Sequence, residues 1–592
     1  MCRIAGLVSN RLDINKTGIV QIMCDTLQHG GPDDEGIYTA ADKVVLGHRR
    51  LSVIDLERRG RQPMADIAQR AHITFNGEIY NYPELKAELL KLGAVFITQT
   101  DTEVIIQAYL HWGINAFGRL RGMFAFALYD NINKKVYLVR DSAGIKPLYY
   151  NVKEQQLAFA SEVKALQIAG IATTKNPDWP VYLLAFGHIP EPYTTLKDVY
   201  SLPKGHFFCW EQDGSYTIKA YQVVFEPINY TNDIQGARLA LYDTLKKAVG
   251  RQLIADAPIG VFLSGGVDSS LLTLLANQEE KQLKTISIFF NEQEYDERKY
   301  QKAVLNRVNG ESFTHLVTQA AFDSNFQQII AALDMPTTDG INSWFISKYA
   351  RESGLKAVIS GIGADEIFGG YPSFRRIKYL KTLRSVPAAL LRAANHWPGG
   401  RFKRFAYLAN DHPIADYLFL RGLFIPSEIK ELTGADSKEI DRILFDDKIG
   451  NNTLNNDKLK ASWFETNLYM QNQLLHDTDV MSMCHGLEVR VPYLDEDLLH
   501  QASMIHPDIR FGGKQGKQIL IDTFKDILPE VVWNRPKMGF TFPLQQWMKE
   551  SKQITNLDLY NSKAAKSTIN KFTGGRLHWS RAFALYHIQG HV

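Results

Sequence analysis

A glycine-rich run, SGGVDSS at positions 264–270, carries residue types that bind phosphate. It follows an apolar stretch over 259–263 and opens another over 270–275, a pattern that predicts a strand, a turn and a helix. Backbone amides in such a turn and the positive end of the helix dipole attract phosphate oxygens. No Gly-Lys-Ser/Thr follows the glycines, and Asp268 suits a Mg²⁺-bound pyrophosphate that departs as a unit. An ordinary strand-to-helix turn is the alternative, and the complete string favours the pyrophosphate site.

A second glycine-rich run, SGIGADE at positions 360–366, follows another expected strand over 356–359. Its glycines allow the backbone to approach a ligand closely. Asp365 could share a Mg²⁺ ion with Asp268, because crowded phosphate groups need a cation between them. A solvated turn with acidic caps would explain this run if it stood alone. Behind a unit that already contains SGGVDSS, a shared phosphate site is the better interpretation.

The second residue, Cys2, could act as a nucleophile. If Met1 is removed, Cys2 carries a thiol and a free α-amine, whose pKa of about 7.7–8.0 lets it accept the thiol proton near neutrality. Asn76 and Gly77 could offer a side-chain amide and a backbone N–H to an oxyanion, as acyl transfer requires. The ordinary alternatives are a chance cysteine and a hairpin at Asn-Gly that breaks the expected strand over 73–81.

The composition is that of an ordinary globular chain of 592 residues, long enough for more than one domain. A formal net charge of +3 without a long basic or acidic block indicates neither nucleic acid nor a membrane surface as partner. No apolar stretch is long enough to cross a membrane, and the N-terminus lacks a signal-peptide pattern. The four cysteines are scattered without CxxC spacing, which argues against a disulfide framework and a zinc site. A cytoplasmic enzyme is the best prediction.

The order of expected elements predicts an α/β multidomain fold with domains at 1–222 and 223–592. The first alternates short strands with few helices, which predicts a layered αββα sandwich. Its last stretch, 187–221, is rich in Pro, Gly and aromatic residues and is expected to be a connector with short strands. The second alternates helices and strands, which predicts a parallel sheet with ligands at the carboxyl ends of its strands, and is mostly helical after about residue 371. The expected helices are 82–92, 103–112, 236–253, 296–308, 322–333 and 343–351, and the expected strands of the parallel sheet are 259–263, 285–290, 313–317 and 356–359.

Several motifs together resemble those of a known family. The N-terminal half resembles the glutaminase domain of class II amidotransferases, which has the N-terminal-nucleophile (Ntn) sandwich, and the 264–270 loop resembles that of the ATP pyrophosphatase superfamily. The further motifs that carry the resemblance are MFAFA at 123–127, RDSAGIKPLY at 140–149, FASE at 159–162, SGIGADEIFGGY at 360–371, GLEVRVPYLD at 486–495 and GKQIL at 516–520. Nearly the whole chain is covered in that family's domain order, so it resembles the glutamine-hydrolysing asparagine synthetases.

The resemblance implies roles for residues of the first domain. Cys2 would attack the side-chain amide of glutamine, and Asn76 and Gly77 would stabilise the oxyanion. Arg50 would pair with the α-carboxylate of glutamine. The α-ammonium would go to Glu78 and to Asp101, for which a helix N-cap is the alternative. The stretch that would line the same pocket is Leu51, Ser52, Val53 and Ile54.

The resemblance also implies an ATP site in the second domain. The residues expected to contact the nucleotide are Leu263, Ser264, Gly265, Gly266, Asp268, Ser269, Ser270, Ile288, Ser360, Gly361 and Lys517. Asp268 and Asp365 would hold Mg²⁺, and Lys517 would neutralise the leaving pyrophosphate. Leu263 and Ile288 could instead be core residues, and Lys517 a surface lysine.

The reaction implied is the synthesis of asparagine from aspartate, glutamine, ATP and water, with glutamate, AMP and pyrophosphate as the other products. Ammonia released at the first site must reach an acyl-adenylate at the second without meeting solvent, which predicts a tunnel between the domains. The family often dimerises, so a homodimer is possible.

Two positions depart from the family pattern. Where the family has HRGPD, this chain has HGGPD at 29–33, so Gly30 replaces an arginine and leaves open how the glutamine loop is ordered. Where the family has Ser-Gly-Glu-Gly, Ile362 replaces the glutamate implicated in forming and using the β-aspartyl-adenylate, and an apolar side chain cannot act as a base. The acceptor could therefore be another carboxylate, such as a sugar uronate. A third hypothesis is a catalytically decayed nucleotide-binding regulator, against which the intact Cys2, Asn76 and Asp268 weigh.

Overall fold

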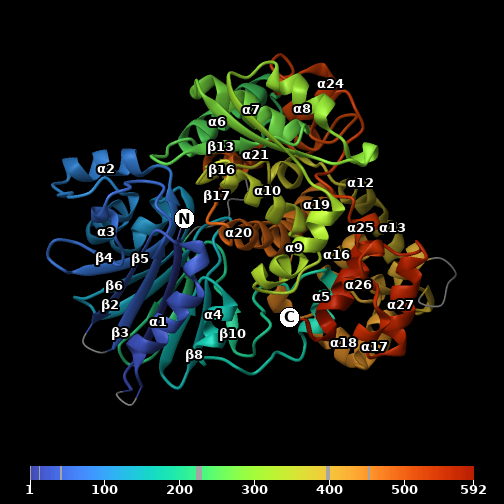
Figure 1. Cartoon of the computed structure of the whole chain (residues 1–592), viewed down its shortest axis with the longest axis horizontal. Coiled ribbons are helices and arrows are strands. Elements are labelled where there is room, and N and C mark those ends of the chain that lie inside the picture. The colour runs from blue at the N-terminus through green and yellow to red at the C-terminus, as the bar shows by residue number, and fades with distance from the viewer. Residues whose placement is uncertain are drawn as a thin grey trace.

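The computed structural model describes residues 2–11, 14–40, 43–221, 230–394, 400–450, 452 and 454–591 (Figure 1). Met1, whose removal the sequence analysis assumes, and the predicted domain boundary at 222/223 lie outside the described residues. Among the described helices, none is both long and apolar enough to cross a membrane.

The N-terminal region contains two six-stranded antiparallel sheets. Its strands are β1 Cys2–Ser9, β2 Asp34–Ala40, β3 Val44–Arg50, β4 Met64–Ala65, β5 Ala71–Ile79, β6 Gly122–Asp130, β7 Lys135–Arg140, β8 Tyr149–Lys153, β9 Gln156–Ala160, β10 Val199–Ser201, β11 His206–Trp210 and β12 Tyr216–Ala220. The order is β10-β8-β9-β1-β3-β2 in one sheet and β12-β11-β7-β6-β5-β4 in the other. Helices α1 (Lys16–Thr26) and α4 (Val163–Ile168) pack on the first sheet, and α3 (Asp101–Trp112) packs on the second beside α2 (Tyr82–Lys91). The predicted αββα sandwich is confirmed.

Strand β5 corrects the expectation of a break at Asn76-Gly77. The strand is continuous, and both residues pair with β6, Asn76 with Ala125 and Gly77 with Phe124. Gly77 has φ +154°, and a Cβ there would lie 2.1 Å from the carbonyl oxygen of Met123. Glycine therefore lets β6 approach closely at this position, and no turn is formed.

The short strands expected in the 187–221 stretch are present, but they belong to the two sheets of the sandwich and do not form a separate connector. Its strands β10, β11 and β12 are edge or near-edge members of the two sheets, because β11 pairs with β7 over 207–210 and β10 pairs with β8. The preceding helix, α5 (Trp179–Phe186), leaves the sandwich and packs against helices of the C-terminal part. Backbone hydrogen bonds from Leu423 and Phe424 to its last turn fix it there.

The second region is built on a parallel sheet of order β15-β14-β13-β16-β17, as predicted from the alternation of helices and strands. Its elements are α6 Ile234–Gln252, β13 Ile259–Phe262, α7 Val267–Glu279, β14 Leu283–Phe289, α8 Arg298–Leu305, β15 Gly310–Leu316, α9 Gln319–Ala332, α10 Ile341–Glu352, β16 Ala357–Ile359 and β17 Glu488–Arg490. The helix expected over 296–308 is shorter than predicted. The last strand, β17, was not predicted; it returns from the helical part and pairs with β16.

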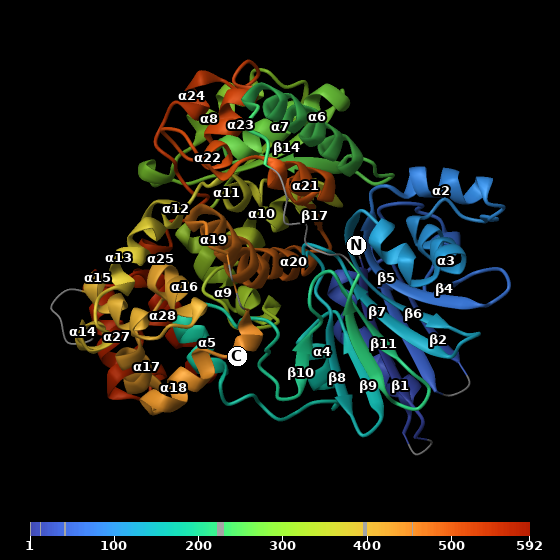
Figure 2. The ribbon, with the colours of Figure 1, turned by 180° about the vertical axis from the view of Figure 1, so that it is seen from behind.

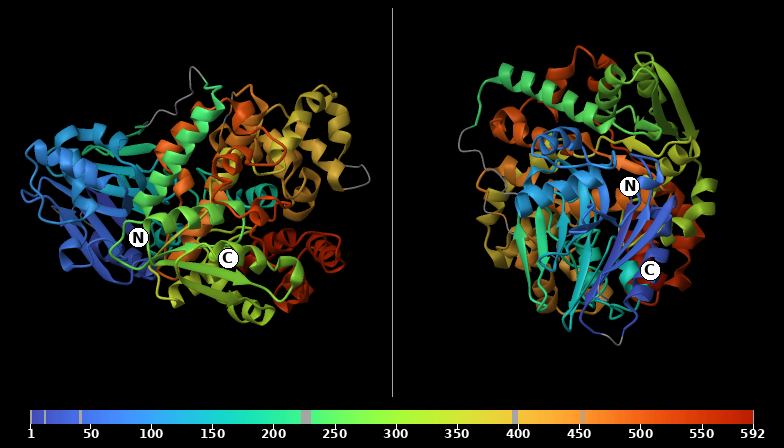
Figure 3. Two further views of the ribbon diagram at one scale, coloured as in Figure 1. Left: turned by 90° about the horizontal axis from the view of Figure 1, so that it is seen from above. Right: turned by 90° about the vertical axis from the view of Figure 1, so that its left-hand side faces the viewer.

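The C-terminal part is helical, as expected. Its helices are α11 Ala364–Phe368, α12 Ser373–Arg376, α13 Leu380–Arg384, α14 Ala388–Ala393, α15 Gly400–Lys403, α16 Pro413–Arg421, α17 Pro426–Thr433, α18 Ser437–Leu444, α19 Asp457–Phe464, the π-helix η9 Glu465–Leu475, α20 His476–Met483, α21 Glu496–Met504, α22 Pro507–Arg510, α23 Gln518–Phe524, α24 Glu530–Trp533, α25 Leu544–Glu550, α26 Lys552–Thr555, α27 Lys563–Thr573 and α28 Trp579–Tyr586. Figures 2 and 3 show the sandwich at one end of the molecule and, in Figure 2, the helices α14, α15, α17, α18 and α27 at the opposite end, while α22, α23 and α24 lie beside α7 and α8.

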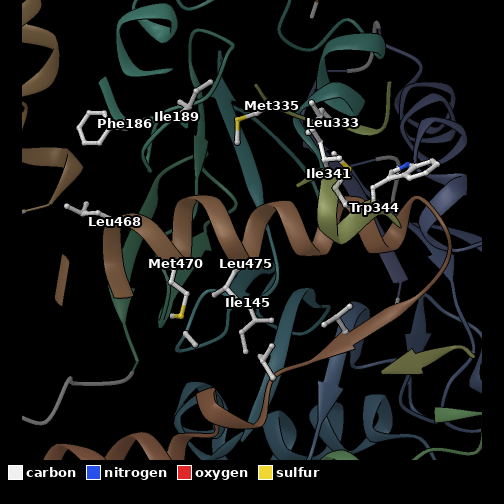
Figure 4. Packing of buried hydrophobic residues seen from close by; sticks show 14 of the residues in the cluster. Ile145, Phe186, Ile189, Leu333, Met335, Ile341, Trp344, Leu468, Met470 and Leu475 are labelled. Carbon is white, nitrogen blue, oxygen red and sulfur yellow. The ribbon is translucent and has the colours of Figure 1, made fainter. Parts of the chain in front are cut away.

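The two regions share one hydrophobic core. Figure 4 shows part of it around η9 and α20: Ile145, Phe186 and Ile189 belong to the N-terminal region, and Met335, Met470 and Leu475 to the second. Because this cluster crosses between the regions, their faces meet as a packed interior.

Candidate active sites

Cys2 is the first described residue of β1 and is buried, opposite Arg50 of β3 in the sheet. Its backbone nitrogen donates to Asn76 Oδ1 at 3.1 Å, and its Sγ lies 3.9 Å from the carbonyl oxygen of Leu51. Burial raises the pKa of the Cys2 thiol. The thiol therefore needs a base before it can act as a nucleophile.

Asn76 presents an unused donor beside that thiol. Its Oδ1 accepts from Cys2, so its Nδ2 is left as the free end of the amide, and this buried nitrogen has no hydrogen-bond partner among the described residues. A buried donor without a partner is costly unless a ligand supplies the acceptor. The geometry fits a donor aimed at an oxyanion.

A cavity opens at Cys2 and gathers most of the predicted glutamine-binding residues. Its lining is Cys2, Arg50, Leu51, Val53, Ile54, Gly60, Gln62, Phe75, Gly77, Glu78, Thr100, Asp101 and Thr102. Two predicted residues are absent from this lining. Ser52 turns its amide to Asp33 Oδ2 at 2.8 Å, and Asn76 reaches the cavity through its contact with Cys2.

The sequence analysis missed five of the lining residues. Thr100 and Thr102 flank Asp101, so their adjacency was a usable signal. Gln62 bridges the Phe75 amide and the Thr102 hydroxyl, and Gly60 lies so close to Arg50 that a Cβ would be 2.3 Å from its Nη2. No local pattern announces either role, because both arise from contacts between separate strands and loops.

The charges around the cavity match a zwitterionic amino acid. The guanidinium of Arg50 donates to the carbonyl oxygens of Ile54, Asp55 and Glu57, and within the described residues it forms no ion pair with a carboxylate. Burial raises the pKa of Asp101 to about 6, and burial followed by repulsion from Glu488 and Asp101 raises that of Glu78 well above its usual range. An incoming ammonium would relieve the two acids, and an incoming carboxylate would satisfy the guanidinium.

Gly30 has a direct structural partner in Arg3. A Cβ at Gly30 would lie 2.7 Å from Arg3 Cγ, so the arginine side chain passes over the glycine. Arg3 is fully buried and pairs with Glu162 at 2.8 Å and with Asp479 of α20 at 2.6 Å. The Arg3 side chain thus occupies the space beside Gly30, and a larger residue at position 30 would collide with it.

The phosphate loop joins β13 to α7 at the carboxyl end of the parallel sheet. The amides of Ser264 and Gly266 are bonded by serine hydroxyls of the loop itself, at 3.2 and 3.3 Å. Helix α7 begins without a side-chain cap, so its first-turn amides are left to a ligand. Gly265 has φ +88°, a backbone conformation that glycine adopts without strain. Arg535, which the sequence analysis missed, donates to the Gly265 carbonyl at 2.9 Å.

The other predicted nucleotide residues lie at the same edge. Leu263 and Ile288 are buried at or just past the ends of β13 and β14, Ser360 and Gly361 follow β16, and Ser269 and Ser270 are in the first turn of α7. Gly361 packs against Asp268, where a Cβ would meet the Asp268 Cβ at 3.1 Å.

Asp268 of the 264–270 run and Asp365 of the 360–366 run both pair with Lys517. Its Nζ lies 2.6 Å from Asp268 Oδ2 and 2.7 Å from Asp365 Oδ1, and Lys537, also missed, lies 2.7 Å from the same Asp365 oxygen. Burial lowers the pKa of Lys517, but the two carboxylates outweigh it and the net shift is upward. Lys517 is buried, so the alternative of a surface lysine is wrong.

The acidic pair fits a cation that also uses ligand oxygens. Within the described residues, no group of three or more His, Cys, Asp or Glu side chains could hold a metal by itself. Asp268 and Asp365 share one ammonium, so their carboxylates are within reach of one ion. Mg²⁺ is commonly held in this way, by one or two carboxylates together with substrate phosphates.

Two models of known protein families match this chain. A family model described as Asparagine synthase matches residues 240–571, and one described as Glutamine amidotransferase domain matches residues 1–222. The chain belongs to the asparagine synthase family. The predicted resemblance is therefore confirmed. Members of this family use ATP, and the family supports a glutamine-dependent amidotransferase.

Three relatives show the range of names in the family. Asparagine synthetase [glutamine-hydrolyzing] 1 of Bacillus subtilis is 32% identical, with 93% of this chain and 88% of the relative covered. Asparagine synthetase [glutamine-hydrolyzing] 3 of the same organism is 28% identical over 93% and 89%. Amidase chry2 of Gibberella zeae is 27% identical over 88% and 84%. A solved glutamine phosphoribosylpyrophosphate amidotransferase of B. subtilis covers 61% of this chain at 13% identity and a TM-score of 0.30, which supports no inference.

Proposed function

We propose that this asparagine synthase family member transfers ammonia from glutamine to a carboxylate that it activates with ATP. The observation that carries the proposal is the cavity at Cys2, in which an unpaired amide nitrogen, a guanidinium and two buried acids meet the nucleophile. The Asp268–Lys517–Asp365 cluster at the edge of the parallel sheet supports the ATP half of the reaction.

In the first site, the Cys2 thiol attacks the side-chain amide carbon of glutamine. With Met1 removed, the α-amine of Cys2 takes the thiol proton and returns it to the departing ammonia. Asn76 Nδ2 and the Gly77 N–H hold the oxyanion. Water then hydrolyses the thioester and releases glutamate, and Arg50, Glu78 and Asp101 hold the two charged ends of the substrate.

In the second site, a carboxylate oxygen of the acceptor attacks the α-phosphorus of ATP, and pyrophosphate leaves. Ammonia attacks the resulting acyl-adenylate, forming the amide and releasing AMP. Lys517 stabilises the negative charge of the leaving pyrophosphate, and Asp268 and Asp365 would hold Mg²⁺. When bound, Mg²⁺ would supply positive charge that offsets the negative charge of the phosphates. Ammonia must pass from the first site to the second without meeting solvent, so a path through the buried interface of the two regions is part of the proposal.

Aspartate is the acceptor we propose first, which makes asparagine the product. Support comes from the B. subtilis relatives that carry the name asparagine synthetase. A second candidate, another carboxylate such as a sugar uronate, is favoured by one observation: the partly buried Ile362 follows Gly361 in the phosphate site and cannot act as a base. A homodimer is part of the proposal for the assembly.

ATP–pyrophosphate exchange tests the acceptor directly. Exchange that depends on aspartate supports asparagine synthesis, and exchange that depends on uronates but not aspartate supports the second candidate. Tight nucleotide binding by calorimetry, without exchange on any acid, would instead point to the decayed regulator. Glutamate release from glutamine is measured separately on the same preparation.

A further inference from the structure

The loop that lines the glutamine cavity, Leu51–Asp55, is fastened to the second region. The carbonyl oxygen of Val53 accepts from the amides of Asp256 at 3.0 Å and Ala257 at 3.1 Å, and the Asp55 amide donates to Asp256 Oδ2 at 2.8 Å. Leu51 and Val53 also form a small apolar cluster with Ala257 and Ala357. Each of these partners lies beside β13 or β16.

The end of this loop has an unusual backbone. Asp55 has φ +50°, a left-handed conformation that non-glycine residues keep only when their surroundings hold it. Its amide is bonded to Asp256, and its carboxylate accepts from Arg59 at 3.0 Å and from the Gln99 amide at 3.2 Å. The hydrogen bond to Asp256 is therefore the support that the second region gives to the left-handed backbone conformation of Asp55.

The shape of the loop sets the position of Arg50. The guanidinium donates to the carbonyl oxygens of Ile54 at 3.3 Å and Asp55 at 2.5 Å. Gly60 also packs against it, since a Cβ there would lie 2.3 Å from Arg50 Nη2. A change at Asp55 would move both carbonyls and with them the guanidinium. Under the proposed function, on which this inference rests, that guanidinium receives the α-carboxylate of glutamine.

Arg490 supports the same segment and reaches the other end of the cavity. Its buried side chain donates to the Ile254 carbonyl at 2.7 Å, and its Nη2 lies 3.6 Å from Glu78 Oε1. Its own carbonyl accepts from the Ser360 amide at 2.8 Å. Arg490 belongs to the GLEVRVPYLD motif at 486–495, to which the proposed chemistry gives no role. It contacts both Ser360, at the start of the 360–366 run, and Glu78 of the glutamine cavity.

We infer that Asp256 is a positioning residue for glutamine, which holds Arg50 in place through Asp55 and the Leu51–Asp55 loop. Asp256 does not touch the substrate. Its segment runs directly into β13 and the phosphate loop, so the second region supplies one support of the glutamine cavity. The glutamine site is complete only in the full chain.

The experiment compares glutamate release against glutamine concentration for the full chain and its Asp256→Ala variant. We expect KM to rise roughly tenfold, the size of one hydrogen bond to a charged acceptor, with kcat within about twofold, because Cys2 and Asn76 are untouched. Asp256→Asn keeps an oxygen that can accept from the Asp55 amide, so its KM should stay near the parental value. Asp243→Ala, an exposed change on α6, is the matched control.

Several results would overturn the inference. One is a KM of Asp256→Ala equal to that of the parental enzyme. Another is an Asp256→Asn variant with a KM as high as that of Asp256→Ala, since loss of the hydrogen bond to the Asp55 amide would not then explain the rise in KM. A lowered Tm with parental KM in the folded fraction would count against it equally. A parental enzyme that releases no glutamate would overturn the proposed function and this inference together, whereas parental turnover with unaffected variants would overturn only the inference.

Discussion

The two candidate sites differ in how their charges are balanced. In the glutamine cavity the Arg50 guanidinium donates, among the described residues, only to carbonyl oxygens, and the acids Glu78 and Asp101 are buried with raised pKa values. In the phosphate site Asp268 and Asp365 are already bridged by Lys517. The first site is preorganised for a zwitterion, and the second has an internal ion cluster.

This difference indicates what binding must do at each site. Under the proposed function, the α-carboxylate of glutamine pairs with Arg50 and its α-ammonium lies between Glu78 and Asp101, so binding requires little rearrangement. Under the proposed function, pyrophosphate and its cation would bring charges into a cluster that is already compensated, so the lysines and carboxylates would exchange partners on binding. We therefore expect a single substitution in the glutamine site to affect only the role of the residue that is changed. A substitution of any one charged residue in the phosphate site should impair the whole cluster.

The largest effect should come from Cys2→Ala. Without the thiol, glutamate release should fall by more than about a thousandfold, because the described lining of the cavity holds no second cysteine to form the thioester. Synthesis from free ammonia should continue at the parental rate. Both activities are followed on one preparation, and parental glutamate release by this variant would show that the N-terminal assignment is wrong.

Asp268→Ala should abolish synthesis from both nitrogen sources. It removes one carboxylate from the cluster and leaves Lys517 with Asp365 alone, so ATP–pyrophosphate exchange should drop by at least about a hundredfold. Glutamate release measured without ATP should persist, which separates the two sites. If this variant retained ATP–pyrophosphate exchange, the contrast between the two sites would fail, because the Asp268–Lys517–Asp365 cluster would then have no part in the chemistry.

Asn76→Ala should lower kcat for glutamate release by about a hundred- to thousandfold, the usual cost of one oxyanion donor. KM for glutamine should change less, since the donor acts mainly in the transition state. Steady-state kinetics make the distinction. An effect on KM alone would mean that Asn76 binds the ground state.

The kcat/KM for glutamine should fall on the acid side of about pH 6. Burial raises the pKa of Asp101 to about 6, so the carboxyl is ionised above that pH and becomes protonated and neutral as the pH falls through it. A neutral Asp101 cannot pair with the α-ammonium, so below about pH 6 its protonation should add about a tenfold loss per pH unit to the loss already caused by protonation of the Cys2 α-amine. The pH profile of glutamate release is the measurement, and Asp101→Asn should lower activity and remove this limb.

The smallest effect concerns Gly30. Gly30→Ala should lower the free energy of unfolding by about 1–3 kcal/mol, because its Cβ would collide with Arg3, which two buried ion pairs hold in place. Denaturant titration measures the loss. Gly250→Ala in α6 is the control, since a Cβ there meets nothing closer than 4.0 Å and alanine favours a helix.

Much of both sites could be predicted from sequence, because their key residues fall in short contiguous strings. The 264–270 and 360–366 runs lie at the carboxyl ends of parallel strands, as expected, and the predicted lining around Arg50 meets Cys2 in one cavity. The break expected at Asn76-Gly77 was wrong, because the same dipeptide that forms hairpins also permits a close strand pair. The short strands expected over 187–221 are present, but their membership of the two sheets was not predicted, because strand pairing depends on partners elsewhere in the chain.

Local sequence predicted the candidate nucleophile, the phosphate loop and the family, since each depends on residues that are neighbours along the chain, and it predicted each member of the acidic pair from its own string. Their meeting at Lys517 depends on the fold. Tertiary structure decided that Arg3 occupies the space beside Gly30, that Arg535 and Lys537 join the phosphate site, and that Asp256 fastens the glutamine loop. These partners are separated by tens to hundreds of residues. Which of them meet depends on how the sheets and helices pack, a property that no single segment encodes.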